Sequence, residues 1–211
     1  MESTFPWDAV LTYSFRWIHY VAGVCWIGLL YFLNLVNTVI QPKFKDAGIT
    51  KQVVPELMPR VLFWFRWAAM FTFLSGLIYV YLAYMKGNPA GHVAFFGTSH
   101  GVWILIGMLF ATIMWFNVWF VIWPTQRKII NGVKSGNPAP PELPKRALLF
   151  SRINTYLSVP MLFLMGAGKH LGAIIDPRTV EGFALLIAII AIGELVVWFA
   201  ITQSSKISTE V

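Results

Sequence analysis

Charged residues are scarce in this chain of 211 residues. Only 12% are charged and 57% are hydrophobic, whereas a soluble domain carries about 25% charged residues. Because lipid excludes charge, this deficit is typical of a protein that lies in a bilayer. The net charge of +7 is concentrated in short loops between apolar runs, so we interpret it as a topology signal and expect no nucleic-acid partner.

Cysteine is nearly absent as well. Cys25 is the only one, so the chain cannot form an internal disulfide. No Cys-x-x-Cys-His motif is present, which excludes covalent attachment of a c-type haem. A structural zinc site, which usually needs four side-chain ligands and often thiolates, is also disfavoured.

Long apolar runs are abundant. Five are long enough to cross about 30 Å of hydrocarbon, and we place them at 11–40, 61–85, 99–123, 147–171 and 181–203. The sequence therefore predicts an all-α integral membrane protein with five transmembrane helices in a single domain over 1–211.

The loops give the orientation of these spans. Ranges 41–60 and 124–146 are rich in lysine and arginine, whereas the N-terminus is acidic and 86–98 carries only Lys86. Basic loops stay in the cytoplasm. We therefore expect the N-terminus outside and the C-terminus inside.

The first four spans have features of an internal repeat. Spans one and three end in an apolar pair, one further residue and a proline, at Pro42 and Pro124. Spans two and four each open with two arginines six residues apart. We predict two helix pairs, 11–85 and 99–171, in a pseudo-symmetric four-helix bundle, with 181–203 appended. The alternative is that these are ordinary terminal prolines and interfacial arginines.

Three histidines fall near one height of the predicted bundle. His19 and His100 lie 23 and 24 residues before the prolines that end their spans, and His170 lies 24 residues after the arginine that opens its span. A helix rises about 1.5 Å per residue, so all three lie near the outer face. Imidazoles inside membranes are rare and need a partner. We expect His19 to be one axial metal ligand, with His170 or His100 the other.

The neighbours of these histidines favour a b-type haem. Arg16 and Gly23 share a helix face with His19, and Gly166 lies one turn before His170. Small residues let a porphyrin approach the backbone, and an arginine pairs well with a propionate. A haem needs only one or two axial imidazoles in an apolar slot, so we predict one haem b. The alternative is a histidine that bonds two helices, with Arg16 reaching the headgroups.

A second polar set lies in the inner half of the spans. It comprises Arg66, Arg152, Asn117 and Glu194. The structural interpretation is a Glu–Arg pair with asparagines that hydrogen-bond helix to helix. The functional interpretation is a proton path or a pocket for a quinol, which makes quinone a candidate partner.

Four stretches resemble the N-terminal membrane domain of bacterial membrane-bound, cytochrome-c-linked urate oxidases. They are 16–28, 60–67, 112–124 and 151–155, and the similarity runs over about 13–172. The first stretch is shared more loosely with copper-resistance and protoporphyrinogen-oxidase type haem membrane proteins. The resemblance implies His19 and His170 as the best matched ligand positions.

The resemblance also implies a multi-pass domain of the bacterial inner membrane that works with a cytochrome c. The residues and the resemblance together leave three expected functions. The first is a haem b electron-transfer protein that exchanges electrons near the outer face with a cytochrome c or the subunits of a larger respiratory complex. The second is a cofactor-free accessory subunit of a membrane complex. The third is a urate-oxidase-like enzyme without the cytochrome c domain, which rests on family analogy alone.

Overall fold

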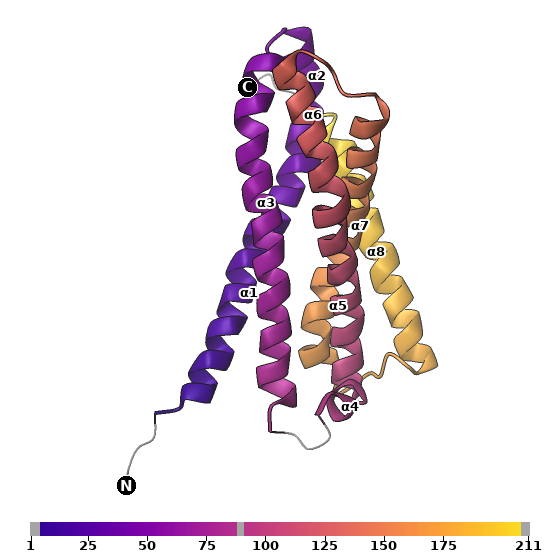
Figure 1. The fold of residues 1–211 in the computed structure, drawn as a ribbon. Coiled ribbons are helices and arrows are strands. Elements are labelled where there is room, and N and C mark those ends of the chain that lie inside the picture. Colours follow the sequence, from indigo (N-terminus) through magenta and orange to yellow (C-terminus); the bar gives the residue numbers. More distant parts are fainter. Residues whose placement is uncertain (1–4, 88–90, 208–211) are drawn as a thin grey trace.

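A computed structural model describes residues 5–87 and 91–207, and the regular structure in these ranges is entirely helical. Five helical runs are long and apolar enough to cross a membrane (Figure 1): Trp7–Asp46, Thr50–Met85, Ser99–Ser135, Glu142–Leu171 and Val180–Ser204. The protein is a multi-pass helical membrane protein, as the sequence predicts.

Several runs contain more than one helical segment. The first comprises α1 (Trp7–Tyr31), the π-helical η1 (Phe32–Asn37) and α2 (Thr38–Asp46), and the second comprises α3 (Thr50–Val80) and the π-helical η2 (Tyr81–Met85). The third comprises α5 (Ser99–Phe116), the π-helical η3 (Asn117–Ile122) and α6 (Trp123–Ser135), preceded by the short α4 (Gly91–Phe96). The remaining runs are α7 (Glu142–Leu171) and α8 (Val180–Ser204).

The helices extend beyond the predicted spans. The two prolines expected to end spans one and three do not end the helices: Pro42 lies inside α2, and Pro124 lies in the first turn of α6. Pro124 follows the π-helical η3 without a break, since Ile122 and Trp123 keep helical dihedral angles, and a local π-helical adjustment lets a membrane helix tolerate the missing amide. The chain leaves the helix only at Gly136, whose φ of 71° is readily adopted by glycine. The α6–α7 connection therefore covers residues 136–141, three of which are prolines.

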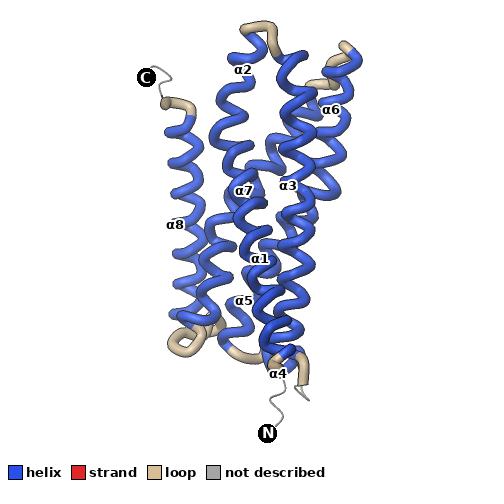
Figure 2. The backbone as a smooth tube through the Cα atoms, turned by 90° about the vertical axis from the view of Figure 1, so that its left-hand side faces the viewer, coloured by secondary structure: helices blue, strands red, loops and turns tan. Residues whose placement is uncertain are grey.

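Two helix pairs form the body of the bundle. α1 packs along α3, and α5 packs along α7. α8 packs mainly against α7 and lies at the edge of the molecule (Figure 2). The predicted pairs and the appended fifth helix are thus present as neighbours, and the N-terminal ends of α1 and α5 lie at the same end as the loop before α8 (Figure 1).

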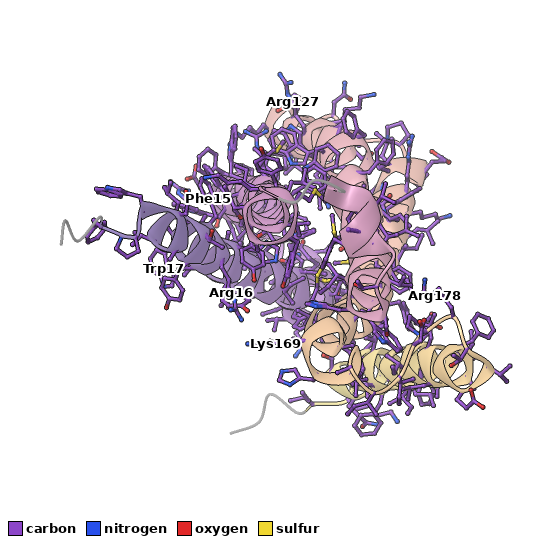
Figure 3. The ribbon with its side chains drawn as sticks, turned by 90° about the horizontal axis from the view of Figure 1, so that it is seen from below. Phe15, Arg16, Trp17, Arg127, Lys169 and Arg178 are labelled. Atoms are coloured by element: carbon purple, nitrogen blue, oxygen red, sulfur yellow. The ribbon has the colours of Figure 1, made fainter. Side chains whose placement is uncertain are left out.

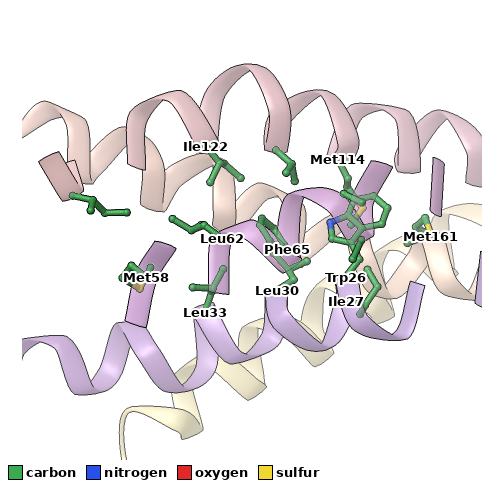
Figure 4. Packing of buried hydrophobic residues seen from close by; sticks show 14 of the residues in the cluster. Trp26, Ile27, Leu30, Leu33, Met58, Leu62, Phe65, Met114, Ile122 and Met161 are labelled. Atoms are coloured by element: carbon green, nitrogen blue, oxygen red, sulfur yellow. The ribbon is translucent and has the colours of Figure 1, made fainter. Parts of the chain in front are cut away.

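The main apolar core lies where the two pairs meet. Trp26 and Leu30 of α1, Phe65 of α3 and Met114 of α5 are at most 1% exposed and belong to one packed cluster (Figure 4). Within a bilayer, helices associate through close packing and interhelical hydrogen bonds rather than through exclusion of water. This core fixes the positions of the residues that line the cavity described next.

Candidate functional site

A cavity of about 270 Å³ lies between α1, α3, α5 and α7, toward the end that carries the N-terminus. This volume is near the lower bound of ligand sites, which span roughly 300–1,000 Å³. His19 of α1 and His100 of α5 both line it, as do Arg16, Tyr84 and Lys169. Two of the three predicted imidazoles therefore share one cavity.

His19 is held by a main-chain group of the neighbouring helix. Its Nδ1 lies 2.8 Å from the carbonyl oxygen of Thr72 on α3. A carbonyl only accepts, so Nδ1 carries the hydrogen and donates it. Nε2 consequently keeps its lone pair. Metal-ligating histidines show this arrangement, in which the second ring nitrogen donates to a carbonyl or carboxylate.

Gly76 makes the contact between His19 and α3 possible. A Cβ atom at this position would lie 2.8 Å from Nδ1 and 2.9 Å from Cε1 of His19. Such distances are shorter than van der Waals contact, so any side chain at residue 76 would displace the ring. The absence of a side chain at Gly76 lets the imidazole reach the carbonyl of Thr72, one turn away on the same helix.

His100 is held by packing. A Cβ atom on Gly168 of α7 would lie 2.7 Å from Cδ2 of His100, and one on Gly172 would lie 2.7 Å from its Cα. The rings of Tyr84 and Phe95 meet the imidazole edge-on, with centroid distances of 5.3 and 5.5 Å. No described residue forms a hydrogen bond with its ring nitrogens, so either nitrogen can present the lone pair of the neutral ring to a ligand.

Two cations belong to the lining of the cavity. Arg16 of α1 donates from Nε to the hydroxyl of Tyr20 at 2.9 Å, which orients its guanidinium. Lys169 comes from α7, and Figure 3 labels both cations at the end of the bundle that it views. Cationic side chains at the edge of an apolar cavity suit a ligand that carries carboxylates.

His170 and Gly166, which the sequence analysis linked to a haem, lie elsewhere. His170 is exposed and does not line the cavity, and a Cβ on Gly166 would have no neighbour within 4 Å. Successive helix residues point about 100° apart, so the residue after Lys169 faces away from the cavity. His170 lies at the end of α7, near the level of the cavity, but its side chain does not point into the cavity. Of the two alternatives for the second ligand, the structure brings His100 to His19.

Gly23 does not face the cavity, contrary to the expectation for a glycine beside a porphyrin, whereas Trp26 does. A Cβ on Gly23 would lie 3.8 Å from Cγ2 of Thr72, so this glycine packs on α3 and does not line the cavity. Trp26 does line it and is 1% exposed, and its indole Nε1 has no hydrogen-bond partner among the described residues. The indole is therefore an unused donor beside the cavity.

Part of the predicted inner polar set is a hydrogen-bonded core. Asn117 donates to Oδ1 of Asn154 at 2.8 Å, and Asn154 donates to the carbonyl of Met114 at 2.9 Å. Asn34 donates to Oγ of Ser151 at 2.8 Å. These bonds cross between helices, which agrees with the structural interpretation of the asparagines.

The charged members of the inner set form no ion pair with one another. The guanidinium of Arg66 lies 4.0 Å from the ring centroid of Trp123, and Nη1 of Arg152 is buried without a hydrogen-bond partner among the described residues. Glu194 is exposed on α8 and forms none of the three ion pairs found over the described ranges. The predicted pairing of Glu194 with Arg66 or Arg152 is therefore not seen.

Residues that the sequence analysis missed are the ones that position the imidazoles. Thr72, Gly76 and Gly168 come from helices other than those of the histidines they contact. For the two glycines the only sequence signal is a glycine inside an apolar span, and for Thr72 there is none. In the described part of the chain, no three or more His, Cys, Asp or Glu side chains gather into a metal site, whereas a haem needs only the two imidazoles.

The fold and the paired imidazoles define a multi-pass helical membrane protein with a histidine-lined cavity. The model of the family described as "Urate oxidase N-terminal" matches residues 90–211, and the chain belongs to this family. The match includes His100 and His170 and begins after His19. The stretches that resemble the family in the sequence begin earlier, near residue 13. Neither the curated proteins nor the solved structures contain a match to this chain.

Proposed function

We propose that the protein binds one haem b in the cavity between α1, α3, α5 and α7 and serves in membrane electron transfer. The observation that supports this proposal is the pairing of His19 and His100 on one apolar cavity, with Nδ1 of His19 engaged by a carbonyl and Nε2 left free. A bound haem would supply one-electron redox chemistry.

The residues present fit such a group. His19 and His100 would hold the haem, and Gly76 and Gly168 leave the space that both rings occupy. Arg16 and Lys169 would pair with carboxylates. The rest of the lining is mostly apolar and aromatic, which excludes water and favours retention of a flat hydrophobic ligand.

The redox partner in this proposal is a cytochrome c or a larger respiratory complex. The cavity lies toward the end of the bundle that bears the N-terminus, and the distribution of basic loops predicts that this end faces outward. Electron exchange would therefore take place near the outer face.

The direct test is the absorbance spectrum of the purified full chain, reduced minus oxidised. We expect a Soret band and an α band of a low-spin b-type haem. His19→Ala and His100→Ala should each abolish or shift these bands, because each removes one axial nitrogen. His170→Ala is the matched control and should leave the spectrum unchanged, because that side chain points away from the cavity.

Two outcomes would contradict the proposal. One is a spectrum without haem bands after expression with sufficient haem and iron. The other is full haem retention in the His19→Ala, His100→Ala double variant. The first outcome, together with stoichiometric co-purification of other subunits, would favour the cofactor-free accessory subunit.

A further inference from the structure

Glu194 is a carboxylate on the side of the membrane-spanning helix α8 that faces away from the bundle. It lies 14 residues after Val180 and 10 before Ser204, which places it about 21 Å and 15 Å from the two ends of α8. Its side chain is exposed, and no hydrogen bond or ion pair links it to the described residues. An ionisable group at this depth is costly in lipid unless it has a partner.

The described residues supply no ion-pair partner for Glu194. Gly193, the preceding residue, packs against α7, because a Cβ there would lie 2.8 Å from Cδ of Pro160. Glu194 is therefore nearly level with Pro160. Arg152 lies eight residues earlier on α7, about 12 Å further along the axis, and so cannot serve as the partner within the chain.

The residues around Glu194 form a continuous seam. Ile187, Ala191, Glu194 and Trp198 are separated by four, three and four residues, so they share one face of α8. All four are exposed, with Ile187 at 50% and Trp198 at 57%. Ala191, one turn from Glu194, would allow close approach of a second helix. α8 lies at the edge of the bundle, so nothing in the described chain covers this seam (Figure 2).

We propose that this seam, defined as Ile187, Ala191, Glu194 and Trp198, is the contact surface of a homodimer formed by a second copy of this chain. Two copies inserted in the same orientation hold Glu194 at the same depth. A two-fold axis along the membrane normal then brings the two carboxyl groups together. A protonated carboxyl is both donor and acceptor, so each group satisfies the other without a cation. A different subunit would instead have to supply a donor at that depth. This inference is independent of whether the cavity binds haem.

Cysteine cross-linking in native membranes tests the geometry. In a Cys25→Ala background, Ala191→Cys should give a disulfide-linked dimer on oxidation. Val196→Cys is the matched control, since Val196 is also exposed but lies about 160° around the helix from Glu194. It should remain monomeric. Equal cross-linking at both positions, or none at either, would overturn the proposed interface.

Substitution of the carboxyl tests the chemistry. Fluorescence energy transfer between labelled copies in lipid vesicles should show dimers for the parent chain and for Glu194→Gln, whose amide also donates and accepts. Glu194→Leu should weaken the dimer by about tenfold, the value of a hydrogen bond between membrane helices. Unchanged helicity by circular dichroism would establish that this variant folds. A Glu194→Leu dimer as strong as the parent, or a seam occupied only by a different subunit, would refute the proposal.

Discussion

Nδ1 of His19 on α1 donates a hydrogen bond of 2.8 Å to the carbonyl oxygen of Thr72 on α3. One bond thus fixes the tautomer and the orientation of the ring. It exists because residue 76 has no side chain between the ring and the carbonyl. The availability of Nε2 depends on a contact between residues that are 53 positions apart in the chain.

Gly76→Ala should reduce haem binding without removing either proposed ligand. The added methyl group would lie 2.8 Å from Nδ1 of His19 and force the ring away from Thr72. We expect loss or a shift of the haem bands at a fixed protein concentration. Gly28→Ala is the control, because a Cβ there meets nothing within 4 Å and alanine favours the helix by about 1 kcal/mol. An unchanged spectrum for Gly76→Ala would show that the carbonyl contact is not needed.

Gly166 and Gly168 flank Ala167, but we expect Gly168→Ala and Gly166→Ala to differ in their effect on haem binding. A Cβ on Gly168 would lie 2.7 Å from the His100 ring and 2.8 Å from Ile104, whereas one on Gly166 would meet nothing. We expect only Gly168→Ala to lower haem occupancy, measured as the ratio of Soret to protein absorbance. Equal effects of the two variants would argue against a role for His100.

Asn154→Leu should destabilise the bundle. Asn154 is fully buried. Its loss would leave the side-chain amide of Asn117 without an acceptor and the carbonyl of Met114 without the bond that Asn154 donates. We expect a loss of about 1–2 kcal/mol in the free energy of unfolding, measured by denaturant titration in detergent. Thr202→Val removes only a bond within α8 and should cost less. Equal losses would mean that the bond between helices adds nothing.

The loop before α8 should show a pH dependence at low pH. Arg178 donates to Asp176 from its side chain and its main chain, which lowers the pKa of that carboxyl to about 2. The pKa in an unfolded chain is about 3.9. Because the folded pKa is lower, the stabilising contribution is complete above about pH 4 and is lost as the pH falls toward 2.

Thermal unfolding of the parent chain and of Asp176→Asn provides the measurement. The difference between their midpoints should be constant from pH 7 to 5 and shrink between about pH 4 and 2. Arg178 also donates to the carbonyl of Gly97 at 3.0 Å, so the ion pair anchors two loops at one end of the bundle. A difference that does not change with pH would show that the pair is not formed in solution.

The sequence predicted the five spans because apolar runs of membrane length leave few alternatives. The ends of the helices were less predictable. Pro42 and Pro124 read as stops, yet each lies within a continuous helical run. Each proline follows a π-helical segment, η1 or η3, and such local adjustments let membrane helices tolerate the missing amide.

The candidate site was predicted in part. The height of His19 and His100 follows from counting residues along straight helices, and both line the cavity. His170 and Gly166 lie at suitable heights but face outward. Spacing along one helix gives the angle between its own residues, but it does not give the rotation of that helix against its neighbours.

By itself, the sequence determined that this is a helical membrane protein, how many times it can span the bilayer and which imidazoles share a level. These depend on composition and on rise per residue, which are local properties. Only the tertiary structure decided that His19 meets Thr72 over Gly76, that His100 rather than His170 shares its cavity, and that Glu194 faces away from the bundle. These depend on how each helix is rotated, and that rotation is fixed by close contacts between residues far apart in the chain.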